Sequence, residues 1–559
     1  MKNIFSNLRN ILCSDKDSVW YSTIAIMVLL VFGQSLSFSF LSWDDTFHIC
    51  QNPNFQSADG SFLNFWKSDF LGLYAPLTYT IWAGLISFAK LIFGENSNCG
   101  EWSGLFHGLN LLIHLLNTIL VYEVLKHLVK VENRKYAAFG AILFAIHPLQ
   151  VEAAVWISAS RDLVSFLFGI CGVLFALKDR WRQATVFVLV SCLAKATGVV
   201  FPLIIFAILI QKRKYSEVTK YLPAFVGAIG FGIFAKFLQP DTALNFVSPI
   251  WQRPFIFGHN LGFYFSKLIL PINLAPDYTR SIQSLNQDPS LFWPLGIFLA
   301  AASGLYFLKR SQGLLALMLI TISVLPVSGL IPFGFEETST VADRYFYPAM
   351  FGVALFAANL LSTYQNKKLN TAALALLMVF SILSFRQVRY WENDETLFDY
   401  NLSVFPNSTV SLQIKADRYF AKGDYQRSLD ELQKVLELRS PNVMIIIKTS
   451  LSLENLGRLD EAEKLYNFAL EKNIKSTDIY NNLGKIHYLK GQPQLAEKLW
   501  MTATQENPLN FQPQYNLGQL YLIQGKFQES LDAFLKAKNI IPQHPRIDEK
   551  IREVRSKIR

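Results

Sequence analysis

The feature that constrains this chain most is a series of long apolar segments that carry almost no charge. No charged residue lies between Asp17 and Asp44, and the stretch Trp20–Leu41 is long enough to cross a bilayer. Only 17% of the 559 residues are charged and the mean hydropathy is +0.25, whereas a soluble domain has roughly 25% charged residues. Most of this chain is therefore expected to lie in a lipid bilayer.

Hydropathy and the distribution of Lys and Arg predict eleven helical spans, with the N-terminus inside and the C-terminus outside. The net charge of +10 comes largely from Lys and Arg in short loops between apolar segments, which indicates membrane topology rather than nucleic-acid binding. The predicted spans cover about residues 19–41, 102–129, 136–156 and 163–177, two short spans within 184–210, and then 221–238, 290–308, 313–332, 344–363 and 369–386.

Two further apolar stretches are not counted as spans. Tyr74–Phe93 lies in the long external loop 42–101, is short and carries Lys90, so it is expected to be interfacial or re-entrant. Phe255–Leu270 is ambiguous, because a crossing there would place the basic Lys309 loop outside. We therefore expect it to lie in the outer interface, with Asn260 and Lys267 on its polar side.

The five cysteines offer no metal-binding spacing. Cys50 and Cys99 fall in one predicted external loop, where an oxidising compartment would allow them to pair. The sequence does not decide whether this disulfide forms.

After residue 390 the composition becomes charged and repetitive. Glycines recur at a step of 34 residues, at Gly423, Gly457, Gly491 and Gly525. A 34-residue period with small residues at matching positions is the signature of tetratricopeptide repeats. Stacked repeats form a solenoid with a concave surface suited to an extended peptide. The predicted fold is all-α, with a polytopic helical bundle over residues 1–390 and an external repeat solenoid over 391–559.

The predicted external turns collect an unusual set of ionisable side chains on one side of the membrane. Two adjacent carboxylates at a membrane edge, such as Asp44 and Asp45, are costly unless they are used. The other candidates are His147, Glu152, Arg161, Lys195, Asp343 and Arg344.

Acids and cations together on one side suit sugar transfer from a lipid-linked phosphosugar. A carboxylate can accept the proton of an attacking hydroxyl, and Arg or Lys can neutralise a phosphate. The lipid phosphate leaves as a stable anion, so a base and a phosphate-binding cation are the minimal equipment. We expect Asp44 and Asp45 to be catalytic and Arg161, Lys195 and Arg344 to bind the donor phosphate.

Structural interpretations stand beside these roles. His147 precedes a proline, which is typical of a helix end. Glu152 and Arg161 would also suit an ion pair between neighbouring spans, and Lys195 would suit snorkelling to the interface.

Arg344 would suit a local ion pair with Asp343, and Asp44 and Asp45 could simply be hydrated residues at a helix end. A divalent metal is possible at Asp44 and Asp45, but histidines with the usual ligand spacing are absent. We therefore expect no required metal or other cofactor.

Several segments, in order along nearly the whole chain, resemble bacterial relatives of the transmembrane and tetratricopeptide-repeat O-mannosyltransferases, which have a GT-C fold. These segments are Trp43–Ile49 with Asn52-Pro53, Tyr74–Thr80, Phe106–His114, His147–Trp156, Ser160–Asp162, Pro276–Tyr278, Ala342–Pro348 and Trp391–Phe398.

The resemblance implies a polyprenyl-phosphate sugar donor, with mannose as the expected hexose, and a Ser or Thr acceptor in a protein. It places Asp44 at the position of the catalytic base and Asp45 as its acidic neighbour. It assigns Arg161 and Arg344 to the donor phosphate. We expect His147, Glu152 and Asp343 to support the site. One departure is that relatives often carry Lys-Glu where this chain has Lys195-Ala196, which leaves the partner of Lys195 undefined.

The sequence thus predicts a membrane protein O-glycosyltransferase whose repeats engage a protein acceptor. The expected location is a bacterial inner membrane with periplasmic repeats, and the alternative is the endoplasmic reticulum with lumenal repeats. A membrane-anchored repeat scaffold would not need eleven spans. Another lipid-linked glycan-handling enzyme, such as a flippase, would favour ionisable groups within the spans, where this chain has few.

The topology is tested by a reporter fused after Phe398. Eleven spans with the N-terminus inside place this position outside, so an alkaline phosphatase fusion is expected to be active and a green fluorescent protein fusion dark. The opposite pattern would contradict the predicted number of crossings.

Overall fold

The computed structural model describes residues 16–55, 62–129, 134–238, 247–287, 310–439 and 441–558, with residues 296, 299 and 302–304. Over these residues the secondary structure is helical, and the only β-pairing is an isolated bridge between Phe70 and Leu73. The all-α prediction is therefore confirmed. The chain divides into two compact units, Met1–Ser408 and Thr409–Arg559.

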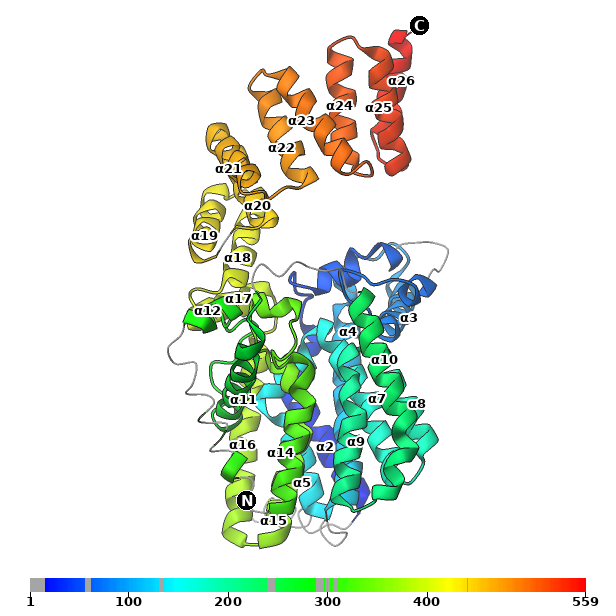
Figure 1. The fold of residues 1–559 in the computed structure, drawn as a ribbon, viewed down its shortest axis with the longest axis vertical. Helices are drawn as coiled ribbons and strands as arrows, with labels where there is room; N and C mark the ends of the chain where they lie inside the picture. Colours follow the sequence, from blue (N-terminus) through cyan, green and yellow to red (C-terminus); the bar gives the residue numbers. More distant parts are fainter. Residues whose placement is uncertain are drawn as a thin grey trace. The chain divides into compact units, whose positions relative to one another are not determined.

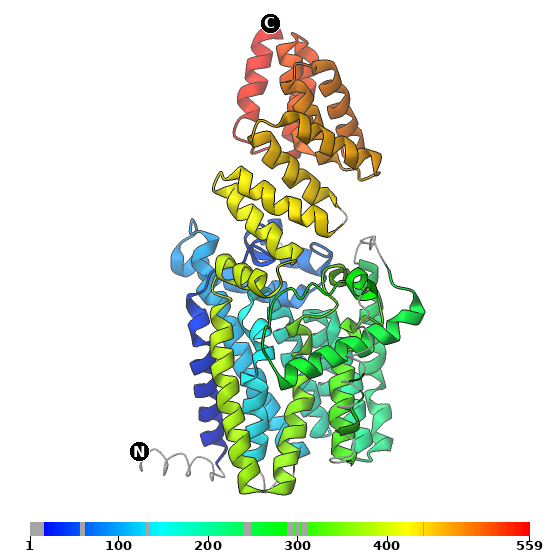
Figure 2. The same cartoon turned by 90° about the vertical axis from the view of Figure 1, so that its left-hand side faces the viewer.

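The first unit is a bundle of helices that run alongside one another (Figures 1 and 2). Its long helices are α2 (Asp17–Phe32), α4 (Ser103–Leu128), α5 (Arg134–Ile146), α7 (Ser160–Leu177), α8 (Trp181–Ala194), α9 (Phe201–Gln211), α10 (Leu222–Leu238), α14 (Arg310–Val324), α15 (Met350–Tyr364) and α16 (Lys367–Arg389). Helix α5 forms the centre, because its residues from Tyr136 to Ile146 are nearly all buried. Gly140 allows α15 to approach, since a Cβ there would lie 2.6 Å from the carbonyl oxygen of Ala354.

Among the described residues, six helical segments are long and apolar enough to cross a membrane. These are Asp17–Ser37, Pro76–Phe93, Cys99–Leu128, Ile157–Leu177, Tyr215–Leu238 and Lys367–Arg389. A seventh is added if Arg134–Ile146 and Pro148–Val155, which meet at a bend of 57°, count as one broken span. Shorter apolar helices occupy other predicted spans, and the predicted span 290–308 lies mostly outside the described residues. The total of eleven spans therefore stays a prediction.

Charged residues lie at both ends of the bundle, as the sequence predicts. At one end Lys126 contacts Asp17 at 3.0 Å, and Lys212 donates to the carbonyl oxygen of His127 at 3.0 Å. At the other end lie the turns that carry Asp44, Arg161, Lys195 and Arg344, and we call this the Asp44 end.

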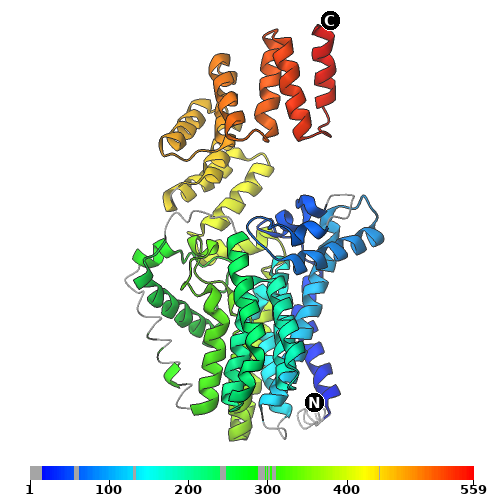
Figure 3. The ribbon, with the colours of Figure 1, turned by 45° about the vertical axis from the view of Figure 1, so that its right-hand side comes forward.

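Helix α3 (Pro76–Phe93) packs on the Asp44 end rather than along the bundle. The Thr78 hydroxyl donates to the carbonyl oxygen of Ala194 at the end of α8, and Trp82 donates to Ser160 at the start of α7. Figure 3 shows this blue segment at the upper end of the bundle. Although α3 has the length of a span, its contacts favour the predicted interfacial or re-entrant helix.

Helix α11 (Arg253–Ile269) does carry Asn260 on its polar side, but that side packs on protein instead of facing the membrane interface. The Asn260 amide donates to the carbonyl oxygens of Ser328 and Thr340, and its oxygen accepts from the Thr340 hydroxyl at 2.9 Å. Arg253 forms a buried ion pair with Glu336. The segment 328–340 therefore satisfies the polar groups that sequence periodicity assigns to the interface.

The second unit is the predicted repeat solenoid. Its helices are α18 (Thr409–Ala421), α19 (Tyr425–Leu438), α20 (Val443–Asn455), α21 (Leu459–Glu471), α22 (Thr477–Leu489), α23 (Pro493–Glu506), α24 (Phe511–Ile523), α25 (Phe527–Ile540) and the terminal α26 (Ile547–Ile558). The recurring glycines have φ between 73° and 77°, in the turn that joins the two helices of each repeat. This left-handed backbone explains why glycine recurs there.

Helix α17 (Asp394–Val404) belongs to the first unit, although the sequence places it with the repeats. Phe398 is fully buried, and the Ser408 hydroxyl donates to Asp277 at 2.6 Å. The division by contacts thus falls after Ser408, later than the predicted boundary at residue 390.

The structure contains the disulfide between Cys50 and Cys99, which the sequence left undecided. These cysteines are separated by 49 positions, and they tie the segment that follows Asp44 and Asp45 to the turn that enters α4. Cys171 and Cys192 are free thiols within the bundle.

Replacing both Cys50 and Cys99 by Ser is expected to lower the free energy of unfolding by about 4 kcal/mol, from the loop-closure entropy regained by the unfolded chain. Thermal unfolding of the detergent-solubilised protein measures this, with Cys171→Ala as the matched control. Equal unfolding midpoints for the double variant and the control would contradict the structural role of the disulfide.

Candidate functional site

Four turns meet at the Asp44 end and bring the predicted site residues together. They follow α2, precede α7, join α8 to α9, and precede α15. They bring together Asp44, Arg161 at the start of α7, Lys195 and Arg344.

Asp45 anchors the turn that follows α2. Its side chain is 1% exposed. One oxygen accepts from the backbone N–H of Leu41 at 3.1 Å, and the other accepts from the N–H and hydroxyl of Ser158 at 2.9 and 2.5 Å. Burial raises the pKa of Asp45 to about 7, and these hydrogen bonds oppose the shift. The carboxylate is occupied by the protein itself, so Asp45 holds the turn in place.

Asp44 takes no part in the hydrogen bonds that hold Asp45. Its side chain is 33% exposed, and one carboxylate oxygen lies 3.5 Å from the Arg161 guanidinium. That distance is an ion pair without a tight hydrogen bond. Asp44 is therefore the accessible acid of the pair, and a bound hydroxyl can reach it.

Arg161 has a spare hydrogen-bond donor beside Asp44. Its Nε donates to the Ser158 carbonyl oxygen at 3.0 Å, which fixes the guanidinium plane. The buried Nη1 atom has no hydrogen-bond partner among the described residues, although the Tyr79 hydroxyl also lies close to the guanidinium. Buried donors are nearly always satisfied, so an unpaired one calls for an explanation. An anion bound next to Asp44 would satisfy it.

Lys195 finds its partner in Asp162 rather than in its sequence neighbour. Its ammonium contacts the two Asp162 oxygens at 2.6 and 2.8 Å. The ammonium also lies 5.7 Å from the centre of the Tyr345 ring. Asp162 is thus the partner of Lys195 that the sequence left undefined.

Arg344 is enclosed by an ion pair and by aromatic rings. Its backbone N–H donates to Glu152 at 3.1 Å, and its guanidinium pairs with the same carboxylate. Four rings, which we call the aromatic cage, lie 4.7 to 5.9 Å from the guanidinium carbon: Tyr345, Phe335, Trp156 and Trp43. The cage favours Arg over Lys, because a guanidinium is weakly hydrated and stacks on rings.

Two of the structural alternatives name the wrong partners. Glu152 pairs with Arg344 and not with Arg161, whose ion-pair partner is Asp44. Asp343 accepts a hydrogen bond from the Tyr278 hydroxyl at 2.7 Å, and its neighbour Arg344 turns to Glu152 instead. Asp343 is buried, and burial raises the pKa of its carboxyl group.

His147 stands at a helix end, as its position before a proline predicts. Its Nδ1 accepts from the backbone N–H of Leu149, so the side chain caps the short turn that follows α5. The other ring nitrogen contacts the carbonyl oxygen of Leu268 at 3.1 Å. His147 therefore supports the fold between α5 and α11, and the contacts described above do not include it.

Sequence reasoning missed Ser158 and the aromatic cage. Trp43 and Trp156 stack at 5.1 Å between ring centres, although they are far apart in sequence. Both residues lie in segments that carry the family resemblance, so the sequence did mark these two positions. Their partnership depends on how α2 and α7 pack.

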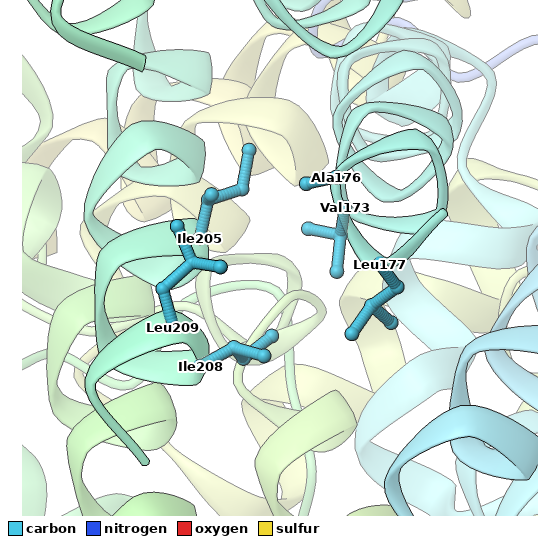
Figure 4. A pocket seen from close by; sticks show the side chains of 6 residues that line it. All are labelled: Val173, Ala176, Leu177, Ile205, Ile208 and Leu209. Atoms are coloured by element: carbon cyan, nitrogen blue, oxygen red, sulfur yellow. The ribbon is translucent and has the colours of Figure 1, made fainter. Parts of the chain in front are cut away.

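The described residues contain no group of three or more His, Cys, Asp and Glu side chains that could hold a metal ion. Asp45 directs its carboxylate to Ser158 and Leu41, away from a shared site with Asp44. A small void between α7 and α9 is lined only by aliphatic side chains: Val173, Ala176, Leu177, Ile205, Ile208 and Leu209 (Figure 4). It offers no polar group for chemistry and is a packing gap.

Comparisons with known proteins agree with this architecture. A family model described as tetratricopeptide repeat matches residues 447–506 and 481–545. The chain is 25% identical over 394 residues to the protein O-mannosyl-transferase F38B6.6 of Caenorhabditis elegans, covering 66% of this chain and 55% of that protein. It is 23% identical over 429 residues to the protein O-mannosyl-transferase TMTC3 of Homo sapiens, covering 65% and 45%. The chain thus spans about half the length of the curated relatives it matches.

Two solved structures resemble part of this chain. The MamA protein is 21% identical, with a TM-score of 0.24, and the match covers 27% of this chain and 81% of that one. The repeat protein YrrB is 18% identical, with a TM-score of 0.24, covering 28% and 82%. These scores are too low to support a conclusion about the whole chain.

Replacing Arg344 by Met is expected to lower the free energy of unfolding by about 3 kcal/mol, because it leaves the Glu152 carboxylate buried without its partner. Thermal unfolding in detergent measures this loss. Glu152→Gln combined with Arg344→Met is expected to recover part of it, because the amide carries no charge to compensate. A double variant that loses the sum of the two single losses would contradict the pairing.

Proposed function

We propose that this chain is a membrane protein O-glycosyltransferase that moves a hexose, expected to be mannose, from a polyprenyl-phosphate donor to a Ser or Thr hydroxyl. One observation carries the proposal. The accessible carboxylate of Asp44 lies beside the Arg161 guanidinium, whose buried Nη1 has no hydrogen-bond partner among the described residues. A base and an unsatisfied anion-binding donor are thus placed side by side.

Asp44 acts as the general base. The acceptor hydroxyl oxygen attacks the anomeric carbon of the sugar, and its proton passes to the Asp44 carboxylate. The bond between that carbon and the phosphate oxygen breaks, and the polyprenyl phosphate leaves with the electron pair. Because this leaving group is a stable anion, the step needs no acid catalyst.

Arg161 binds the donor phosphate through its unpaired Nη1. Lys195 and Arg344 complete the positive field, although Asp162 and Glu152 partly neutralise them. Their fixed positions allow the site to stabilise the developing phosphate charge without reorganising during the reaction. A charge-assisted hydrogen bond from a guanidinium to a phosphate is roughly twice as strong as a neutral one.

The acceptor is a polypeptide, because the chain continues into tetratricopeptide repeats that match their family model. Such arrays present an extended surface for a peptide. Membrane helices, the one-sided site and the O-mannosyl-transferase relatives support a reaction at the external face, with the repeats on the same side. The reaction requires no metal, so transfer is expected to be equal with and without a chelator.

Asp44→Asn is expected to lower the turnover number for sugar transfer by a factor of about 10²–10⁴, the usual contribution of general-base catalysis. The purified chain is given radiolabelled polyprenyl-phosphate mannose and a protein extract from the same membrane compartment, and labelled protein is counted. Arg161→Gln is expected to raise the KM for the donor and to lower turnover, because the phosphate loses its guanidinium.

Glu95→Gln is the matched control, because Glu95 is an exposed acid in the same loop as Asp44. Equal transfer by the wild type and Asp44→Asn would overturn the general-base role. No transfer from any lipid-linked sugar, with a bound polypeptide partner still retained by the repeats, would favour a scaffold instead. A panel of polyprenyl-phosphate hexoses decides the sugar.

A further inference from the structure

Helix α17 meets the chain just before Asp44, although about 350 residues separate the two segments. The Asp394 carboxylate accepts a hydrogen bond from the backbone N–H of Ser42 at 2.9 Å. The carbonyl oxygen of Glu392 accepts from the backbone N–H of Ser39 at 3.0 Å. Two consecutive parts of the approach to Asp44 are thus tied to the start of α17.

The side chain of Trp43 is held by the same helix. The fully buried ring of Phe398 packs edge-on against Trp43, with 6.3 Å between the ring centres. Trp156 stacks on Trp43 at 5.1 Å with an angle of 13° between the rings. Aromatic pairs at these separations contribute about 0.5–1.5 kcal/mol beyond their burial, so Trp43 has one preferred position.

The start of α17 is itself rigid. Asn393 caps the helix, with its side chain accepting from the backbone N–H of Thr396 at 3.0 Å and the Thr396 hydroxyl accepting from the Asn393 N–H. A capping box of this kind satisfies two otherwise unpaired backbone donors. Asp394, the next residue, therefore presents its carboxylate to Ser42 from a fixed place.

Asp44 is therefore bracketed by anchored neighbours. Ser42 and Trp43 before it are held by α17, and Asp45 after it is held by Ser158. The Asp44 side chain between them contacts Arg161 at 3.5 Å. A catalytic carboxylate is most effective when its backbone is held in this way, because small displacements of a reacting group cost rate steeply.

We propose that Asp394 and Phe398 of α17 are positioning residues that hold the Ser42–Asp44 turn in its productive place. This inference rests on the proposed function, in which Asp44 is the base. Both act through the turn and not through the reacting groups. The last helix before the repeats thus completes the transferase site at the Asp44 end.

The test compares Asp394→Ala, Asp394→Asn and the neighbouring Glu395→Ala in the full chain. Glu395 is an exposed acid on the same turn of α17 and serves as the matched control. Two readouts are taken: kcat and donor KM for sugar transfer, and backbone hydrogen exchange of residues 39–46. The exchange measurement does not depend on activity.

Asp394→Ala is expected to lower kcat about tenfold or more with an unchanged donor KM, and to speed exchange of residues 39–46, because the turn loses its anchor. Asp394→Asn is expected to stay within about threefold of the wild type, because its amide oxygen still accepts from Ser42. Phe398→Leu provides a second route if Asp394→Ala does not fold, and is expected to give the same split between kcat and KM.

Unchanged exchange in Asp394→Ala would overturn the anchoring, and faster exchange with unchanged kcat would overturn its catalytic importance. Asp394→Asn as impaired as Asp394→Ala would overturn the hydrogen bond as the cause. If the wild type transfers no sugar, the proposed function fails and the inference about catalysis fails with it. Exchange of residues 39–46 then still decides whether α17 anchors the turn.

Discussion

The candidate site depends on the hydrogen bonds that Asp45 accepts on both of its carboxylate oxygens. They join the turn after α2 to the start of α7, and they compensate a carboxylate that has lost its hydration. Once Asp45 faces inward, the adjacent side chain of Asp44 must take another direction. It emerges beside Arg161 and remains accessible. The buried acid thus determines where the accessible acid can act.

The cations around Asp44 can share a small volume because carboxylates from other helices neutralise them. Lys195 pairs with Asp162, and Arg344 pairs with Glu152. Breaking such a buried pair is expected to cost more than the pair contributes, because an uncompensated charge is left behind. Among the described cations of this cluster, Arg161 differs in keeping a buried donor without a partner. A field built in this way exists before a substrate arrives, which is what electrostatic catalysis requires.

Much of the fold could be predicted because it depends on local pattern. Apolar length places the helices of the bundle, and the 34-residue step places the repeats, whose glycines all adopt the left-handed turn. The pattern was less informative for α11, whose polar residue Asn260 bonds to Thr340 within the protein. The sequence pattern also assigned α17 to the repeats, because charge composition does not show that Phe398 is buried against Trp43. Hydropathy indicates how polar a helix is, but it does not indicate which part of the protein the helix packs against.

The sequence by itself determined that the acids and cations of the site would gather at one end of the bundle, because the number of crossings assigns each turn to an end. It did not determine which carboxylate would hold which cation. Only the tertiary structure decided that Asp162 pairs with Lys195 and that Glu152 pairs with Arg344. The physical reason is that an ion pair depends on the rotation and depth of helices far apart in the chain, and these are set by packing around the whole bundle.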